Sequence, residues 1–115
     1  MQGPDRVKIL DDWREVVNMT AGDVDRWLRD PRSRLVGSRP AGASETVGRR
    51  SGRRIAKMLR AGQARWTASD WAWAKKVVGY CRRHLAQRRA EWGADVEDRK
   101  WTWSLRNWGH DPAKE

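Results

Sequence analysis

Apolar residues recur every three or four positions along most of the chain, which is the spacing of helices that bury one face. In the N-terminal part this pattern predicts a helix over residues 5–18 and a second helix between Thr20 and Pro31. Thr20 and Asp23 have the spacing of a capping box, in which each side chain bonds the other residue's backbone N–H. We expect these two helices to form a hairpin.

The stretch over residues 32–44 interrupts the periodic pattern. Gly37 and Pro40 stand there among serines and arginines, so this stretch predicts a mobile basic loop. A third helix is expected to begin near Ser44. Over residues 47–60 its apolar and cationic positions separate onto two sides of a helical wheel, which predicts one buried face and one charged face.

A long helix is predicted from Thr67 to about Arg88, because Thr67 and Asp70 form a second capping box ahead of a regular apolar stripe. Nearer the C-terminus, Trp101 and Leu105 fit a short helix that folds back on the others, although alternating residues in this segment would also suit a strand. These elements predict an all-α fold. We expect residues 1–115 to form a single small domain of four or five helices, with a long basic helix hairpin at its centre.

Charge is distributed unevenly along the chain. The formal net charge is +10, and sixteen of the 25 Lys and Arg residues lie between Arg32 and Arg89, where only Glu45 and Asp70 oppose them. The two flanking segments are slightly acidic, and we expect them to pack behind the basic hairpin. Concentrated like charge destabilises a compact chain unless a polyanion relieves it, and DNA and RNA are the obvious cellular polyanions.

We therefore predict a nucleic-acid interface on the third and fourth helices, lying side by side. Helical spacing places six cations on one side of the third helix, and cations of the fourth helix form the opposite wall. The predicted interface residues are Arg49, Arg50, Arg53, Arg54, Lys57, Arg60, Arg65, Trp66, Lys75, Lys76, Arg82 and Arg83, with Arg88 and Arg89 extending the second wall. If about eight of these cations met phosphates, log affinity would fall with log salt at a slope of roughly −7.

Double-stranded DNA contacted through its phosphates, with little sequence specificity, is the favoured ligand, because the Asn and Gln side chains that read adenine are scarce here. The nine tryptophans raise the alternative of base stacking in a single strand. We expect most of them in the core and Trp66, Trp73 and Trp92 to be exposed. Trp66 is the best candidate to stack on a base, since it follows Arg65 and precedes a helix.

A different function class stays open beside nucleic-acid binding. The chain could be a protein-interaction module, such as a phage or bacterial regulator that docks its arginine face on an acidic partner. A merely solvated helix face would mix Glu with Lys, but no acid occurs between Thr46 and Ser69. Gly48 and Gly52, four residues apart, permit close helix contact within the domain or across a homodimer.

Candidate catalytic and metal-binding residues are few, so we expect neither an enzyme nor a cofactor. Cys81 is the single cysteine and falls on an apolar stripe, where a small buried hydrophobe is the usual role. His110 and Asp111 resemble a catalytic pair, but such a turn more often caps a helix and buries its histidine in hydrogen bonds. No run of residues approaches the length of a membrane span, so we predict a cytoplasmic, nucleoid-associated protein without a membrane partner.

Several short motifs occur in order along the chain. They are Asn18-Met19-Thr20, Ser51-Gly52-Arg53-Arg54-Ile55, Lys76-Val77-Val78-Gly79-Tyr80, Arg83-His84-Leu85-Ala86-Gln87-Arg88 and Asn107-Trp108-Gly109-His110-Asp111-Pro112. This set resembles a small bacterial, mostly actinobacterial, domain family of unknown function whose members are often labelled DNA-binding. The resemblance extends from about residue 10 to residue 114. It implies DNA binding but assigns no catalytic or ligand residue.

Overall fold

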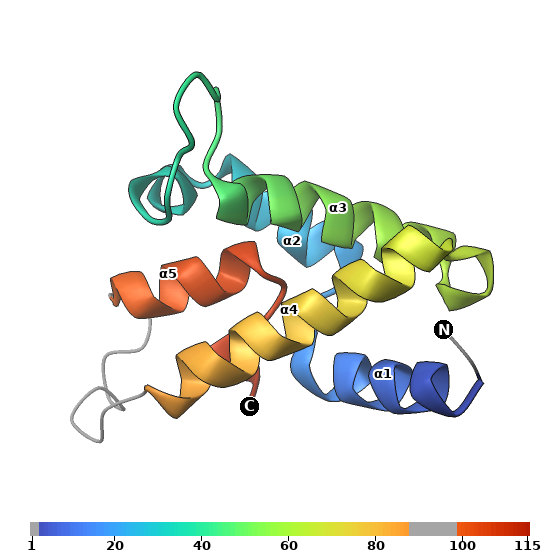
Figure 1. Cartoon of the computed structure of the whole chain (residues 1–115). Coiled ribbons are helices and arrows are strands. Elements are labelled where there is room, and N and C mark those ends of the chain that lie inside the picture. The colour runs from blue at the N-terminus through green and yellow to red at the C-terminus, as the bar shows by residue number, and fades with distance from the viewer. Residues whose placement is uncertain (1–2, 88–98) are drawn as a thin grey trace.

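Helices account for nearly all regular structure in the computed structural model, which describes residues 3–87 and 99–115. The α-helices are α1 (Gly3–Val16), α2 (Ala21–Arg29), α3 (Val47–Ala61), α4 (Ala68–Ala86) and α5 (Lys100–Asn107), and the short 3₁₀ helices are η1 (Pro31–Leu35), η2 (Gln63–Arg65) and η4 (Pro112–Lys114). The prediction of an all-α fold with four or five α-helices is confirmed (Figure 1).

Side-chain caps define where three of the helices begin. Both predicted capping boxes form, with Thr20 and Asp23 ahead of α2 and Thr67 and Asp70 ahead of α4. The third helix begins at Val47 rather than near Ser44, because the Thr46 hydroxyl accepts a hydrogen bond from the backbone N–H of Arg49. These local bonds satisfy N–H groups that a helix start leaves without a partner.

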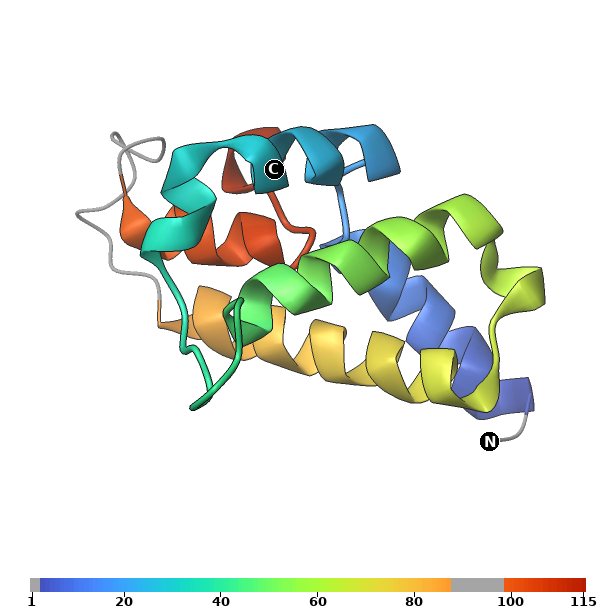
Figure 2. The ribbon, with the colours of Figure 1, turned by 90° about the horizontal axis from the view of Figure 1, so that it is seen from above.

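The helices pair differently from the predicted order. α1 packs chiefly against α4, and α2 against α3, so the expected hairpin of the first two helices is wrong. α3 and α4 run in opposite directions and are joined through η2; they diverge toward the start of α3 in Figure 1, where α5 lies between them, and toward η2 in the view from above in Figure 2. The predicted central hairpin is therefore a pair of crossed helices rather than two rods in contact along their length.

Trp108 is a side chain that lies between α3 and α4. Its ring stacks on Tyr80 of α4, with ring centroids 4.1 Å apart, and on Trp73, at 6.2 Å. On the other side its indole nitrogen reaches Gly48 of α3, where an added Cβ would lie 3.3 Å from it. α3 and α4 thus hold their spacing because a large ring from the C-terminal segment separates them.

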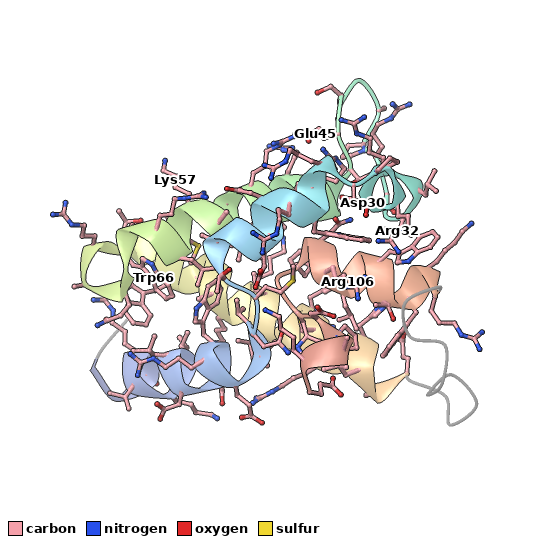
Figure 3. All side chains as sticks on the ribbon, turned by 180° about the vertical axis from the view of Figure 1, so that it is seen from behind. Asp30, Arg32, Glu45, Lys57, Trp66 and Arg106 are labelled. Carbon is pink, nitrogen blue, oxygen red and sulfur yellow. The ribbon has the colours of Figure 1, made fainter. Side chains whose placement is uncertain are left out.

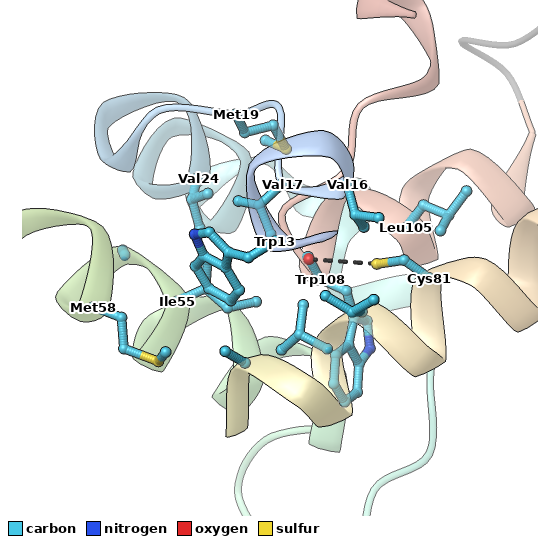
Figure 4. Close-up of a cluster of buried hydrophobic side chains, with 14 of the residues drawn as sticks. Trp13, Val16, Val17, Met19, Val24, Ile55, Met58, Cys81, Leu105 and Trp108 are labelled. Carbon is cyan, nitrogen blue, oxygen red and sulfur yellow. Dashed lines mark hydrogen bonds between the residues drawn. The ribbon is translucent and has the colours of Figure 1, made fainter. Parts of the chain in front are cut away.

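The hydrophobic core draws on all five α-helices and the turn after α5 (Figure 4). Ile55, Val24 and Leu105 are fully buried at its centre. Cys81 is the small buried hydrophobe that its position predicts, with its thiol 3.7 Å from the carbonyl oxygen of Trp108. Burial raises the pKa of the Cys81 thiol to about 12, so the side chain stays protonated and unreactive.

A buried polar network joins α2, η1, α3 and α5. Asn107 lies at its centre, 1% exposed, and its Oδ1 accepts hydrogen bonds from Trp27 Nε1 at 2.9 Å and from Ser33 Oγ at 2.6 Å. Its Nδ2 donates to the carbonyl oxygen of Ser33. Arg49 then donates to Ser33 Oγ and to the carbonyl oxygen of Leu28, both at 2.8 Å. Buried polar groups are stable only when paired in this way.

The segment predicted as an irregular loop over residues 32–44 begins with the 3₁₀ helix η1, so this part of the prediction is wrong. Asp30 caps η1 by accepting a bond from the N–H of Arg32, and Ser33 is drawn into the buried network. The chain from residue 36 to residue 46 is irregular, and it turns at Gly37 and Gly42, which have positive φ values of 94° and 78°.

Gly48 and Gly52 serve a contact within the chain. A Cβ at Gly52 would lie 2.8 Å from the backbone oxygen of Asn107, and one at Gly48 would lie 3.3 Å from the Asn107 Cβ. The pair therefore lets α3 approach the end of α5, and it does not support the homodimer that the spacing suggested. Among the described helices, none combines the length and the apolar composition needed to cross a membrane.

Gly52→Ala should destabilise the protein by about 1–3 kcal/mol, because the added methyl group meets the fixed backbone of Asn107. Gly79→Ala is the matched control within α4. Its Cβ would meet only the flexible end of Arg83, so the substitution should be neutral or stabilise by up to about 1 kcal/mol through helix propensity. Urea unfolding followed by circular dichroism measures both, and equal effects would contradict the proposed α3–α5 contact.

Candidate nucleic-acid interface

The predicted cations of α3 fall on two sides of the helix. Arg53 and Arg60 are seven residues apart on one side of α3, from which Arg60 reaches α2 and pairs with Asp25. Arg53 forms a bidentate contact with Glu45, with nitrogen–oxygen distances of 2.6 and 2.9 Å. The hydrogen bonds from these arginines lower the pKa of Asp25 and of Glu45, so both carboxylates remain charged.

Arg49 does not belong to the exposed face, and its assignment to the predicted interface is wrong. The residue is 4% exposed. Its guanidinium donates to the carbonyl oxygen of Leu28 and to Ser33 Oγ, and its Nε lies 3.4 Å from a carboxylate oxygen of Glu45. Burial is the main cause that lowers the pKa of Arg49. On a helical wheel Arg49 lies at the edge of the cationic side of α3. In the folded protein this edge faces Leu28 of α2 and Ser33, whose oxygens accept hydrogen bonds from the buried guanidinium.

The remaining cations of α3 share another side of the helix by their spacing, and Arg54 among them contacts α4. Arg50 and Lys57 are exposed and have no carboxylate partner within residues 3–87 and 99–115. Lys57 extends away from α3 into solvent (Figure 3). Arg54, on the same side, donates to Ser69 Oγ at 2.8 Å and to Asp70 at 3.2 Å, which ties α3 to the first turn of α4.

Trp73 joins the cations of the two helices. The guanidinium carbon of Arg54 lies 4.9 Å from the centroid of the Trp73 ring, and Lys76 Nζ of α4 lies 4.8 Å from it. A ring attracts such cations through its negative face. Two positive charges, one from each helix, are thereby held next to the same ring, although the helices diverge.

The cations of α4 also divide. Arg82 pairs with Asp12 at 3.1 Å and with Glu15 at 3.5 Å, both on α1, and Lys75 is seven residues from Arg82 on the same side. The N-terminal carboxylates therefore do not all pack behind the basic helices, as predicted, but neutralise part of them. Lys76 and Arg83 are exposed on the outer side of α4, and neither has a carboxylate partner among the described residues.

A basic hollow of about 620 Å³ lies between the end of α3 and the start of α4. Arg53, Arg54, Lys57 and Arg65 contribute its cations, and Asp70 is its one acid. A bond from the N–H of Thr67 is the main cause that lowers the pKa of Asp70, and Arg54 lowers it further. We define the α3–α4 surface as Arg50, Arg54, Lys57, Arg65, Lys76 and Arg83.

Trp66 is not available to stack on a base, so this prediction is wrong. It is 8% exposed, its Nε1 donates to the carbonyl oxygen of Met58, and its ring packs edge-on against Trp13 and Trp71 (Figure 3). Each of these indoles completes the core between α1 and α4. Trp73, also expected to be exposed, is half-buried. The predictions for Arg88, Arg89 and Trp92 fall outside the described residues.

His110 has the structural role that its turn predicts. It is 4% exposed, with Nδ1 2.6 Å from the carbonyl oxygen of Val16 and Nε2 2.8 Å from a carboxylate oxygen of Glu115. Asp111 bonds Arg106 and caps η4. Within the described part of the chain, no three His, Cys, Asp or Glu side chains are grouped closely enough to hold a metal ion.

Residues 12–106 match the model of DUF3140, a family whose description reads protein of unknown function. The chain belongs to the DUF3140 family. Neither a curated protein nor a solved structure matches it. The DUF3140 match includes every cation of the α3–α4 surface and ends before His110 and Asp111, so the region shared with the family contains the basic helices.

Arg49→Ala should destabilise the protein by about 2–4 kcal/mol, since it leaves the Ser33 hydroxyl and the Leu28 carbonyl oxygen buried without their donor. Arg50→Ala, one residue away on the exposed side, should change stability by less than about 0.5 kcal/mol. Denaturant unfolding of the two variants measures the difference. Similar stabilities would mean that the guanidinium of Arg49 is not held inside the protein.

Proposed function

We propose that this protein binds double-stranded DNA through its phosphates, with little sequence specificity, and that the α3–α4 surface is the binding site. The observation that carries the proposal is the convergence of Arg54 and Lys76 on Trp73, which joins cations of two helices into one surface. An array of positive charges drawn from two helices suits a polyanion better than a small ligand.

Unsatisfied charge supports the proposal. Five of the six cations of the α3–α4 surface have no carboxylate partner within the described ranges, and the sixth, Arg54, has Asp70. The four carboxylates that pair with Arg53, Arg60 and Arg82 lie on the other sides of the two helices or at their edges. The cations that face outward between them are therefore the ones left for an external anion.

The chemistry of the surface favours phosphate contact over base reading. Arg and Lys bonds to phosphates position a protein on DNA without reading its sequence. The eight described tryptophans are all buried or half-buried, and the ring of Trp73 is occupied by Trp108, Arg54 and Lys76. A single strand that stacks its bases on open indoles is therefore a less suitable ligand than a duplex.

Salt dependence tests the proposal. Six phosphate contacts predict a slope of log affinity against log salt of about −5, less steep than the value of about −7 expected from the sequence. The double variant Arg50→Gln, Arg65→Gln should reduce this slope by about 2 and weaken binding by at least about tenfold. Fluorescence anisotropy of a labelled 20-base-pair duplex, titrated at several salt concentrations, measures both quantities.

The matched control is Arg26→Gln, Arg29→Gln, which removes the same charge from the exposed side of α2. Within the described residues Arg26 pairs with Asp23 at the surface, so its loss should have little effect on stability. The control should bind the duplex nearly as tightly as the unmodified protein. Equal losses in the two double variants would overturn the placement of the site, and absence of duplex binding at low salt would overturn the function in favour of an acidic protein partner.

A further inference from the structure

A second basic hollow, of about 400 Å³, lies at the other end of α3. Its walls come from η1, the segment that follows it and the first turns of α3. The lining residues are Arg34, Arg39, Ser44, Glu45, Thr46, Arg49 and Arg53. Arg34 and Arg39 were not among the residues predicted from the sequence for the interface, because they belong to a stretch without helical spacing.

The charges of this second hollow are unbalanced. Arg34 and Arg39 are exposed and have no carboxylate partner within the described parts of the chain. Glu45 is the one acid in the wall, and both of its oxygens already accept hydrogen bonds from Arg53. Glu45 therefore serves Arg49 and Arg53, and Arg34 and Arg39 offer an added anion donors that no carboxylate of the described residues occupies.

Like charges are also crowded in this hollow, which favours the binding of an anion. Burial is the main cause that lowers the pKa of Arg49; Glu45 opposes this effect, and the nearby charges of Arg53 and Arg34 lower the pKa further. Positive groups that destabilise one another in this way are stabilised by a bound anion. The hollow is thus suited to a phosphate group, which offers several oxygens to adjacent guanidinium groups.

The two basic hollows lie toward opposite ends of one straight helix. Arg53 contributes to both, Arg39 precedes the start of α3, and Arg65 follows its end. α3 has 15 residues, which at 1.5 Å per residue makes it about 22.5 Å long. The major groove of B-form DNA is about 12 Å wide, so cations at both ends of such a helix can reach phosphates on both edges of the groove.

We propose that the hollow beside Arg34 and Arg39 is a second phosphate-binding site, and that it binds the strand opposite to the one held beside Lys57 and Arg65. α3 then spans the major groove with one strand at each end. This inference rests on the proposed function and deepens it, because it specifies a B-form duplex as the ligand and assigns the segment after η1 a direct contact with DNA.

Two duplexes of different groove geometry test this inference. Duplex RNA is A-form, and its major groove is too narrow and deep for the same span. The unmodified protein should therefore bind a 20-base-pair DNA duplex more tightly than an RNA duplex of the same sequence, by about tenfold for the phosphates lost. The double variant Arg34→Gln, Arg39→Gln should lose about tenfold in affinity for DNA but less than about twofold for RNA, which removes the preference.

Each outcome bears on one of the two proposals. Equal weakening of both duplexes by Arg34→Gln, Arg39→Gln, or weakening of neither, would overturn the second site while leaving the α3–α4 surface in place. The α3–α4 surface would be overturned instead if Arg34→Gln, Arg39→Gln weakened DNA binding while Arg50→Gln, Arg65→Gln bound DNA as tightly as the unmodified protein. Arg26→Gln, Arg29→Gln should keep the preference for DNA, and circular dichroism should show the same helix content in all variants.

Discussion

The buried hydrogen bonds of Asn107 hold together the elements that present the basic surface. A single side-chain amide accepts from Trp27 and Ser33 and donates back to Ser33, and Arg49 extends the network to Leu28. None of these groups could be buried alone without a large loss of stability. Because these groups are hydrogen-bonded to one another, they hold α2, η1, α3 and α5 in fixed relative positions. The exposed cations of α3 are therefore held in fixed orientations as well.

The same constraint explains why α3 contains glycine where a helix would otherwise favour alanine. Gly48 and Gly52 let the backbone of α3 approach Asn107, and Trp108, the next residue, separates α3 from α4. The short C-terminal segment therefore sets both the depth at which α3 lies and the angle at which the two basic helices diverge. The shape of the proposed DNA-binding surface depends on residues that do not contact the ligand.

Local signals in the sequence were sufficient for the helices but not for their pairing. Capping boxes and apolar spacing depend on neighbouring residues, so the starts of α2 and α4 could be predicted closely. Whether a cation faces solvent depends on acceptors distant in the chain: Arg49 is turned inward by Leu28 and Ser33, and Arg82 is met by Asp12. Net charge counted along the sequence therefore overestimates the charge that an external anion can reach.

Asp70 gives the proposed site an internal counter-ion that can be replaced. Its carboxylate caps the first turn of α4 through the N–H of Thr67, and it also bonds the guanidinium of Arg54. The cap does not depend on Arg54. If a phosphate binds Arg54, Asp70 loses one partner but still caps the start of α4. The carboxylate of Asp70 can therefore be replaced by a phosphate at Arg54 without any helix having to unwind.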